Sequence, residues 1–310
     1  MIVVAVPAVA LAVVSLAAFL GRWIWWLDVL ANFRAQYVVT LALLGLVVAM
    51  SKWRKTGYAI LGVALVNLVV VLPLYVGSPA EAMVDLPSVR VMSFNLLADN
   101  ESYSEVIDYI GTVSPDLVLL HEASRPWEVA IESAGLDYQI VRARSDELIF
   151  GTLALVRGSD VEAVSYGFAS TSPRAVEITF TPDGWPEPVS ALGVHPLAPT
   201  DEERADLRDA QLGFAGQWAS SEGGPFVIAG DFNSTPWSWP FRRLLSSADL
   251  RNSQVGFGLQ PSFSSETNLL LRVPIDHLVH SPDLEVTDRR LGPRLGSDHF
   301  PLLVDLQLAG

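Results

Sequence analysis

Three short polar motifs in the last quarter of the chain each lie on an apolar, strand-like segment: Gly-Asp-Phe-Asn at 230–233, Ile-Asp-His-Leu at 275–278 and Ser-Asp-His at 297–299. Two earlier segments have the same character, Ser-Phe-Asn at 93–95 and His-Glu at 121–122. Carboxylates, carboxamides and imidazoles at strand ends are the groups that a hard divalent cation and a phosphate ester require. We therefore expect a metal-dependent phosphoesterase.

Hydrolysis of a phosphate ester needs a cation to neutralise the phosphate oxygens, a base to activate water and donors that hold the phosphorus in line. Mg²⁺ takes oxygen ligands and keeps several waters, so an amide and one or two carboxylates such as Glu122 suffice to hold it. In an extended chain Asp231 and Asn233 point the same way and would face one site. His299 is a candidate general base, and Asp276 is a partner that fixes its tautomer.

Each of these residues also has a simpler interpretation when it is taken alone. Glu122 suits a surface strand end, Asn95 suits a turn, and Asp231 with Asn233 suits an Asx-turn. A single histidine at a strand end, such as His195, is more often part of the hydrogen-bonded structure than of a catalytic site. The hypothesis depends on these residues coming together in space.

Strand alternation also separates the two Asp-His pairs. Asp276 and His277 would point to opposite faces of a strand, so only one of them is expected to be catalytic. The same choice applies to Asp298 and His299, unless the turn at 296–297 lets both point inward.

Composition limits the classes of function. The chain has 310 residues, which allow two domains, a formal net charge of −14 and no lysine after Lys55. This acidic balance argues against tight, non-specific nucleic-acid binding, which rests on lysine and arginine side chains that neutralise phosphates. Because the chain has no cysteine, it has no disulfide framework and no thiolate chemistry.

The first 76 residues predict a membrane region with three transmembrane helices, over about 2–20, 35–51 and 57–76. These runs approach the ~20 apolar residues that cross a bilayer. The alternatives are buried helices of a soluble domain, or a cleaved signal peptide at 2–20; the latter would lack the usual basic residues before its apolar run. Trp23, which directly follows the first run, is typical of a membrane interface. The lipid bilayer is therefore an expected partner.

The loop at 51–56 predicts the orientation. It carries Lys52, Arg54 and Lys55 within a very short segment, and basic loops stay in the cytoplasm. Following each span in turn places the amino terminus inside and everything after Val76 outside. We expect a multi-pass protein of the cell membrane with an extracytoplasmic catalytic domain.

Residues 77–87 are rich in small residues and proline and predict a linker, and the domain at 88–310 has a different texture. Short apolar β-type runs alternate there with helical patterns. The expected strands are Val89–Phe94, Leu117–Leu120, Ile149–Val156, Ala175–Phe180, Val189–Val194, Phe226–Ala229, Ile275–Val279 and Leu302–Leu306. The expected helices are Tyr103–Thr112, Trp127–Ala134, Glu202–Ser220 and Phe241–Ser247. This pattern indicates a layered α/β sandwich with mixed or antiparallel sheets.

The motifs, together with His195 in Gly-Val-His-Pro-Leu-Ala-Pro, resemble the endonuclease/exonuclease/phosphatase superfamily, which has the DNase I-like fold. Their order and spacing agree with that superfamily over about 88–308. Each motif is weak by itself, but six in order are specific. The resemblance implies a four-layered α/β/β/α sandwich with the active site at the sheet edges. The chain is similar to a bacterial branch of the superfamily that has three amino-terminal spans and an outward-facing catalytic domain. Some members of that branch are associated with lipid-linked phosphate chemistry and glycopeptide resistance.

The resemblance also implies roles for the site residues. A metal ion, Mg²⁺ or Mn²⁺, would be held by Asn95, Glu122 and Asp298. An acid–base dyad would be formed by Asp276 and His299. The water and the phosphate would be positioned by Asp231 and Asn233, and the scissile phosphate would be contacted by His195. One departure is His121, where the superfamily commonly has glutamine; strand alternation predicts that it points away from Glu122.

Three functions compete. The first is a membrane-tethered phosphoesterase that acts on a lipid-linked phosphate at the outer face. Tethering raises the effective substrate concentration, and Trp237, Trp239 and Phe241 would suit a membrane surface unless they pack in the core. The second is a surface nuclease, a reading that keeps nucleic acid as a possible but less favoured partner. The third is a non-catalytic anchored binding domain, which the complete set of site residues disfavours. The arginines that a nuclease groove would use are Arg242, Arg243, Arg251 and Arg272.

Overall fold

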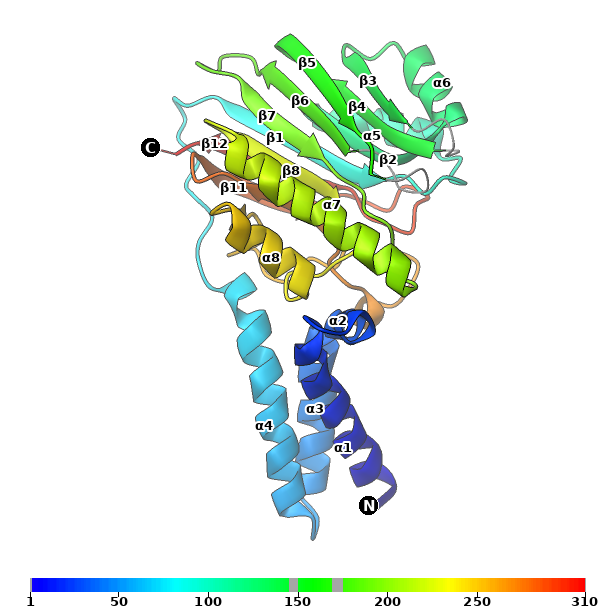
Figure 1. The fold of residues 1–310 in the computed structure, drawn as a ribbon, viewed down its shortest axis with the longest axis vertical. Helices are drawn as coiled ribbons and strands as arrows, with labels where there is room; N and C mark the ends of the chain where they lie inside the picture. Colours follow the sequence, from blue (N-terminus) through cyan, green and yellow to red (C-terminus); the bar gives the residue numbers. More distant parts are fainter. Residues whose placement is uncertain (1, 145–149, 169–174, 310) are drawn as a thin grey trace.

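The computed structural model of the protein describes residues 2–144, 150–168 and 175–309. It has two parts, a narrow helical bundle and a larger α/β sandwich mounted on one end of it (Figure 1). The helices of the bundle are α1 (Ile2–Ala17), η1 (Ala18–Leu20), α2 (Trp25–Ala31), α3 (Arg34–Ala49), α4 (Arg54–Val71) and η2 (Leu72–Tyr75), where η denotes a 3-10 helix.

Two segments of the bundle are long and apolar enough to cross a membrane. They are Val3–Leu20, with a mean hydropathy of 2.7, and Arg54–Tyr75, with 2.3. The helix α3 has 16 residues, or about 24 Å, which is less than the ~30 Å of a hydrocarbon core. It qualifies only together with α2, as one span bent by 66°. The expected span at 35–51 therefore qualifies only as part of a bent pair, and α2 lies across the end of the bundle beneath the sandwich (Figure 1).

A buried arginine ties the long helices of the bundle together. Arg34 Nη1 donates to the Ser15 carbonyl and to Asn67 Oδ1, both at 2.8 Å. Its guanidinium also lies over the ring of Phe19, 3.7 Å from the centroid. A buried charged group is costly unless it has such partners. Arg34 therefore connects α1, η1, α3 and α4, whose other surfaces are mainly apolar.

The sandwich is built from two six-stranded mixed sheets, in the orders β11-β12-β1-β2-β4-β3 and β5-β6-β7-β8-β10-β9. The pairs β1–β2 and β7–β8 are parallel, and the other paired strands are antiparallel. The strands of the first sheet are β1 (Ser88–Asn95), β2 (Leu117–Ser124), β3 (Gln139–Arg144), β4 (Phe150–Val156), β11 (Leu284–Leu291) and β12 (Leu302–Leu308). Those of the second are β5 (Ser159–Tyr166), β6 (Ala175–Thr181), β7 (Val189–Gly193), β8 (Phe226–Asp231), β9 (Arg251–Asn252) and β10 (Asp276–His280).

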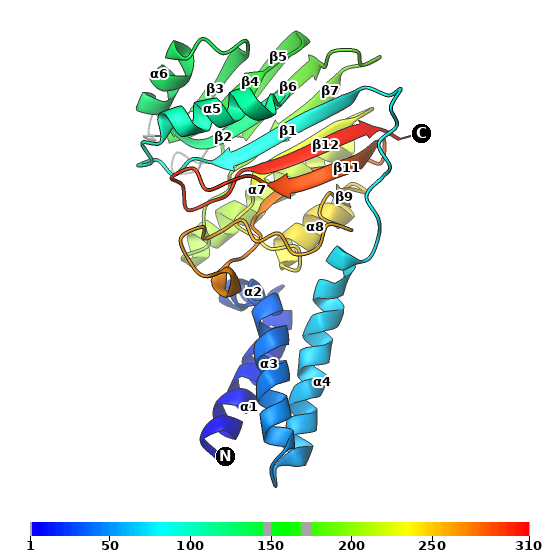
Figure 2. The ribbon, with the colours of Figure 1, turned by 180° about the vertical axis from the view of Figure 1, so that it is seen from behind.

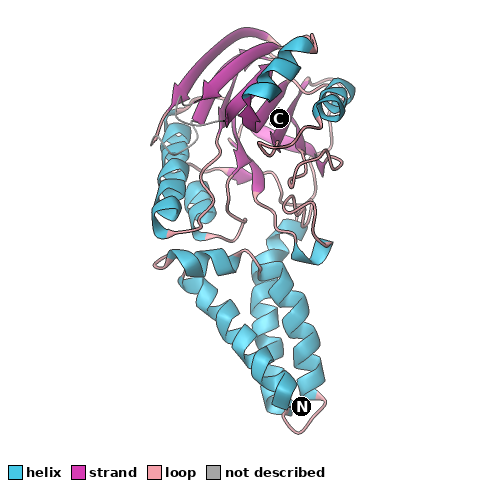
Figure 3. Ribbon diagram, turned by 90° about the vertical axis from the view of Figure 1, so that its right-hand side faces the viewer, coloured by secondary structure: helices cyan, strands magenta, loops and turns pink. Residues whose placement is uncertain are grey.

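Helices cover the outer face of each sheet. The helices α5 (Tyr103–Val113) and α6 (Arg125–Ser133) lie on the first sheet, and α7 (Glu202–Ser221) and α8 (Trp239–Ser247) lie on the second (Figures 1 and 2). Leu119 of one sheet and Ile178 of the other belong to the core between the sheets. Trp127 and Phe241 anchor the two outer cores. The expected four-layered α/β/β/α sandwich is therefore confirmed, and the side view shows it above the bundle (Figure 3).

All the strands that the sequence pattern missed are edge strands. The missed strands β3, β5, β9 and β11 are the outermost members of the two sheets. Edge strands have one side open to solvent and carry polar residues, so they lack the continuous apolar runs that mark central strands. The expected strand at 149–156 corresponds to β4, and its first residue, Ile149, lies outside the described residues.

The segment 77–87 has no helix or strand, yet hydrogen bonds hold it against the first sheet. The Ala80 amide donates to the Val286 carbonyl at 3.0 Å. Gln307 Nε2 donates to the Met83 carbonyl at 3.0 Å. The segment is thus a strap fixed along β11 and β12 rather than a free tether.

A second set of polar contacts docks the bundle on the sandwich. Arg208 of α7 is buried, and its Nη2 lies 3.2 Å from Asp28 Oδ2 of α2. The Trp239 amide at the start of α8 donates to Asp28 Oδ1 at 2.7 Å. One turn further along, Asn32 Oδ1 accepts a hydrogen bond from Thr235 Oγ1 at 3.1 Å. These contacts fix the orientation of the sandwich relative to the helices.

Candidate active site

The predicted site residues meet where strands of the two sheets end side by side. Asn95 is the last residue of β1, and Glu122 lies near the end of β2. On the second sheet, Asp231 ends β8 and stands directly opposite Asp276, the first residue of β10. The loop before β12 adds the Ser-Asp-His motif, including His299. Segments up to about 200 residues apart in the chain thus supply one cluster.

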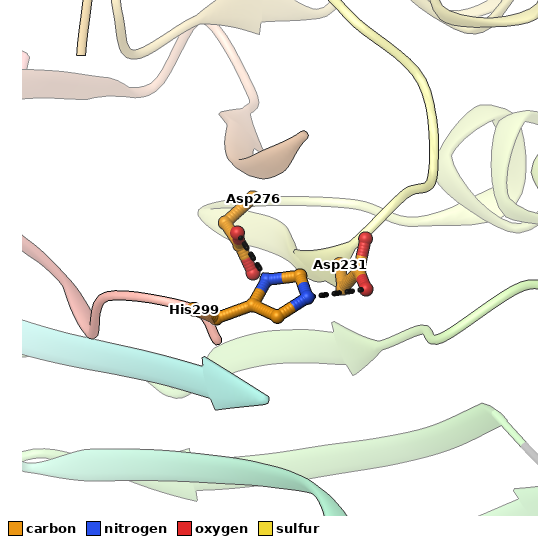
Figure 4. A group of neighbouring side chains, drawn as sticks. All are labelled: Asp231, Asp276 and His299. Atoms are coloured by element: carbon orange, nitrogen blue, oxygen red, sulfur yellow. Dashed lines mark hydrogen bonds and ion pairs between the residues drawn. The ribbon is translucent and has the colours of Figure 1, made fainter. Parts of the chain in front are cut away.

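His299 lies between two buried aspartates (Figure 4). Its Nδ1 is 2.8 Å from Asp276 Oδ2, and its Nε2 is 3.6 Å from Asp231 Oδ2. Burial by itself would lower the pKa of His299, but the charges of Asp276 and Asp231 outweigh burial and raise the pKa to about 10. Burial would raise the pKa of Asp276, and the nearby His299 reverses this and holds it below its usual value. The pair is a carboxylate–imidazolium ion pair with its second nitrogen directed at Asp231.

A second group of contacts joins the two sheets through an amide. Asn95 Nδ2 donates to Glu122 Oε1 and to Asp231 Oδ2, each at 3.1 Å. His195 Nε2 lies 3.7 Å from the same two oxygens. The Ala98 amide donates to Glu122 Oε2 at 3.2 Å. The carboxylates of Glu122 and Asp231 are therefore bridged by the Asn95 amide, and His195 lies beside both.

Irregular backbone is what brings these side chains inward. The pairing of β2 with β4 shifts register between Leu120 and Ala123, and Glu122 has a φ of 56°. Asn233 has a φ of 48° and donates its amide hydrogen to Asp231 Oδ1 at 2.9 Å. Left-handed conformations are costly for residues other than glycine and cluster at functional sites. They replace the regular alternation on which the sequence analysis relied.

The bulge changes the place of Glu122 rather than that of His121, which the sequence analysis expected on the opposite face of the strand. His121 continues the alternation of Leu117 and Leu119, which both lie between the sheets, and the left-handed backbone at Glu122 turns that carboxylate towards Asn95. His121 is fully buried between the sheets, with its ring centroid 5.5 Å from that of His195. Its Nδ1 lies 3.2 Å from Thr152 Oγ1. Burial, the larger effect, and the nearby His195 lower the pKa of His121 to about 3, so it is a neutral residue packed behind the site.

The other Asp-His pair behaves as alternation predicts. His277 points away from Asp276 and packs against the rings of Phe232 and Phe241, with centroids 5.3 and 4.5 Å away. Its Nε2 donates to the Ser234 carbonyl at 2.7 Å. His277 is therefore a structural residue beneath the Gly-Asp-Phe-Asn motif.

The Ser-Asp-His turn faces the end of β1. Ser297 Oγ donates to the Asn95 carbonyl at 2.7 Å, and the Asp298 carbonyl accepts the Ser265 amide at 2.6 Å. Burial raises the pKa of Asp298, and the charge of Glu122 adds to that rise. Because Glu122 and Asp298 repel each other across this turn, a bound cation would relieve the repulsion. These oxygen donors fit a hard divalent cation.

Another trio also offers metal ligands. Asp231, Asp276 and His299 each present a ligand atom within 4.8 Å of the others. However, His299 Nδ1 is already hydrogen-bonded to Asp276. A histidine held in this way acts in proton transfer or charge stabilisation rather than as a ligand through that atom. The sequence analysis assigned the cation instead to Asn95, Glu122 and Asp298, which are all oxygen donors.

Two residues that support the dyad were missed by the sequence analysis. Ser262 Oγ accepts the amide hydrogen of Asp276 at 3.1 Å. The buried Arg289 donates to the Asp276 carbonyl at 3.4 Å and to Ser253 Oγ at 3.1 Å. Ser262 lies in a loop and Arg289 in an edge strand, so neither belongs to a recognisable motif.

The aromatic residues after the Gly-Asp-Phe-Asn motif pack rather than face solvent. Phe241 is fully buried in the core beneath α8. Trp237 is also buried, in a cluster with Ala18 and Leu74 of the helical bundle. Of the two alternatives left open by the sequence analysis, core packing therefore holds for Trp237 and Phe241. Trp239 is partly exposed, and the guanidinium of Arg22 lies over its ring, 4.9 Å from the centroid.

The comparisons with known proteins agree with this geometry. The model of the Endonuclease/Exonuclease/phosphatase family matches residues 92–299. The chain belongs to this family. The match begins in β1 and ends at His299, so it includes every motif of the cluster. Members of the family are metal-dependent phosphoesterases and nucleases. A comparison with curated proteins found no match.

Solved structures show the same fold at low sequence identity. TDP2 from Caenorhabditis elegans has 20% identity and a TM-score of 0.58, and the alignment covers 71% of this chain and 98% of that one. A functionally unknown conserved protein from Enterococcus faecalis has 14% identity and a TM-score of 0.61, covering 71% and 100%. The human Nocturnin catalytic domain has 18% identity and a TM-score of 0.59, covering 76% and 99%. Because these alignments cover 71–76% of the chain, part of the chain lies outside the shared fold.

Proposed function

We propose that the protein is a membrane-anchored, Mg²⁺- or Mn²⁺-dependent phosphoesterase whose catalytic domain faces the outside and hydrolyses a lipid-linked phosphate or phosphodiester. Family membership supports phosphoester hydrolysis. The two apolar helices, with a third as a bent pair, support an anchor at residues 1–76. Outward-facing side chains such as Val13, Leu43 and Leu65 are exposed, and a lipid environment would cover them.

In this proposal each site residue has one role. Glu122, Asn95 and Asp298 hold the divalent cation, which, when bound, supplies positive charge that neutralises the phosphate oxygens. His299, oriented by Asp276, exchanges a proton with the attacking water or the leaving group. A cation beside these carboxylates would lower the pKa of His299 from about 10 towards neutral, where a histidine can act as a base.

The remaining residues position the reactants. Asp231 lies 3.6 Å from His299 Nε2 and is placed to orient the attacking water. Asn233 Nδ2 donates to the Pro196 carbonyl at 2.9 Å, which keeps this amide at the mouth of the site. His195 lies beside Glu122 and contacts the scissile phosphate in this scheme. Preorganised donors of this kind stabilise developing charge without reorganising during the reaction.

The observation that carries the lipid assignment is the direct contact path from the site to the membrane helices. The ring of Phe263 lies 4.8 Å from that of His299. The Phe263 amide donates to the Val273 carbonyl at 3.0 Å. The neighbouring Arg272 carbonyl accepts a hydrogen bond from Gln36 of α3 at 2.9 Å. One loop thus separates the dyad from a helix of the bundle, which suits a phosphate at the bilayer surface.

The arrangement of the bundle supports the outward orientation. The turn between α3 and α4, which carries Lys52, lies at the end of the bundle far from the sandwich, as does the start of α1 (Figure 1). Basic turns remain in the cytoplasm. With that end inside, the sandwich lies on the opposite side of the membrane.

A nuclease is the second candidate, because a related fold binds DNA. The structure of TDP2 from D. rerio, 15% identical, is of a complex with a single-stranded DNA product. The four arginines that would line a nucleic-acid groove are dispersed here. Arg242 lines the junction with the bundle, Arg243 lies between α7 and α8, and Arg251 lies beside the strap at 78–80. Arg272 alone lies in the loop next to the site, bonded to the Ser265 carbonyl at 3.1 Å.

A substrate panel tests the proposal. The full-length protein in nanodiscs would be assayed with Mg²⁺ for phosphate or product release from a polyprenyl pyrophosphate, a phospholipid, a water-soluble phosphate ester and plasmid DNA. We expect the lipid substrates to be cleaved with the highest kcat/KM. Preferred cleavage of DNA would overturn the lipid assignment in favour of the nuclease. Absence of hydrolysis on all four substrates would refute a phosphoesterase.

A further inference from the structure

Three consecutive leucines stand exposed at the tip of the loop that leads to the site. Leu269, Leu270 and Leu271 form η3 (Leu269–Leu271) and are 62, 65 and 62% exposed. The turn is fixed by Asn268, whose Oδ1 accepts the Leu270 amide at 3.1 Å. An exposed run of large apolar residues beside polar neighbours marks a surface that contacts lipid or a partner.

The exposed leucines form one wall of a groove against the helical bundle. The loop, orange in Figure 1, lies beside α2 at the end of the bundle. Leu269 and Leu270 face Val39 and Thr40 of α3 across the groove, and Tyr75 lines the same space. The groove has a volume of about 330 Å³, which lies within the ~300–1,000 Å³ typical of small-molecule sites. Its walls are mainly apolar.

The groove lies at the end of the bundle that would meet the membrane surface in the proposed function. Val39 and Thr40 lie more than one turn inside α3, which begins at Arg34. The exposed Trp23 and Trp26 stand at the same end of the bundle, in and beside the turn before α2. Tryptophan at a helix end marks the membrane–water interface. The apolar wall of the groove is thus continuous with the lipid-facing surface of the bundle, which argues for a hydrocarbon chain as the occupant.

Hydrogen bonds connect one wall of the groove to the catalytic cluster. Arg272 lines the groove, and its Nη2 donates to the Ser265 carbonyl at 3.1 Å. Ser265 in turn donates its amide hydrogen to the Asp298 carbonyl at 2.6 Å and its hydroxyl to the Ser297 carbonyl at 2.6 Å. A single arginine therefore stands between an apolar channel and the predicted metal ligands. The protein thus presents an apolar groove, then a cationic side chain, then the predicted metal site. This order matches a lipid whose phosphate is esterified at the end of a hydrocarbon chain.

We propose that this groove, between η3 and α3, binds the hydrocarbon chain of the lipid-linked substrate while its phosphate lies at the catalytic cluster. This proposal rests on the phosphoesterase function proposed above and assigns the part of the protein that recognises the lipid. The chain leaves the bilayer between Leu270 and Val39, and Arg272 contacts the phosphate end.

A chain-length series tests the groove. The full-length protein, in detergent with Mg²⁺, would be given esters that share one phosphate head group and carry chains from a methyl group to a long isoprenoid. For the native protein kcat/KM should rise by roughly fourfold for each methylene that enters the groove, the factor that corresponds to ~0.8 kcal/mol. The variant Leu269→Ser/Leu270→Ser should lower the ratio of long-chain to methyl-ester activity by at least about tenfold. Both side chains are exposed, so the fold should persist.

A matched control and a binding measurement complete the test. Val164→Ser changes an exposed apolar residue, 50% exposed, on the outer strand β5, far from the bundle (Figure 1), and should leave the ratio unchanged. With excess chelator, a non-hydrolysable long-chain phosphonate should bind the native protein more tightly than the leucine variant. Equal ratios and equal phosphonate binding for native protein and variant would overturn the groove while hydrolysis persists. If the native protein hydrolyses no ester of the series, the phosphoesterase function itself fails.

Discussion

Replacing Asp28 with asparagine tests whether the helical bundle positions the sandwich. Asp28 accepts from two donors of the sandwich, Arg208 Nη2 at 3.2 Å and the Trp239 amide at 2.7 Å. The Asp28 and Arg208 side chains are 3% and 1% exposed. Asparagine keeps the shape and one acceptor oxygen, but it removes the charge that faces a buried guanidinium.

The structure sets the expected loss of stability. Removing one partner of a buried ion pair typically costs about 3–5 kcal/mol. Arg208 keeps a second carboxylate, Asp209 Oδ1 at 2.8 Å, so the loss should be at the lower end, about 3 kcal/mol. For a domain of this size that loss lowers Tm by roughly 6–12 °C.

Thermal unfolding of the full-length protein in detergent measures this loss. Asp305→Asn is the matched control, because the same substitution there breaks a two-bonded ion pair with Arg90, at 2.6 and 2.7 Å, that is more exposed than the Asp28 pair and makes no contact with α2. Hydrogen exchange at the Trp239 amide should accelerate in Asp28→Asn and stay unchanged in Asp305→Asn. If both variants lower Tm equally and leave the Trp239 amide equally protected, the junction does not hold the two parts together.

Three further outcomes follow from the site and its surroundings. Glu122→Gln should lower the rate at least ~100-fold at saturating Mg²⁺, whereas full activity of the native protein in excess chelator would contradict a metal ligand. The double variant Asp276→Asn/His299→Ala should be little worse than His299→Ala alone, because members of one unit are not additive; losses that multiply would separate the two residues. Burial lowers the pKa of His280 to about 4, below its unfolded value of ~6.5, so the unfolded state binds the extra proton and stability falls as pH drops from about 6.5 to about 4. His280→Gln should reduce that loss by about 3 kcal/mol, and an identical pH dependence of Tm would contradict it.

The central strands and the cluster could be predicted from the sequence because each has a local signal. Buried strands such as β8 read as continuous apolar runs, and the polar motifs follow them directly. The order of the six motifs along the chain then predicted the fold, since each motif is weak alone but the six in this order are specific to one superfamily. The edge strands could not be predicted in this way because their sequences mix polar and apolar residues and contain no continuous apolar run.

Other features could not be predicted because they depend on tertiary contacts. The position of the Glu122 carboxylate beside Asn95 follows from the left-handed backbone at Glu122, and a glutamate in the sequence does not predict that conformation. The pairing of Asp28 with Arg208 joins residues far apart in sequence, and nothing local distinguishes Asp28 from an ordinary acidic residue between two spans. The short α3 and its bend at 32–33 follow from that same docking of α2.

The docked junction changes what the membrane region does for catalysis. An eleven-residue flexible linker would let the sandwich wander over roughly 18 Å and would raise only the effective substrate concentration. Here the strap at 77–87 is bonded along β11 and β12, and Asp28, Asn32 and Gln36 hold the sandwich at fixed points. Cutting the strap alone should therefore leave the sandwich attached to the bundle. In the proposed function a fixed mount would hold the cluster at one height above the bilayer, and correct placement of reacting groups can supply several kcal/mol of a reaction barrier. The bundle is then a part of the site's geometry, since it carries one wall of the groove through which a lipid would reach His299.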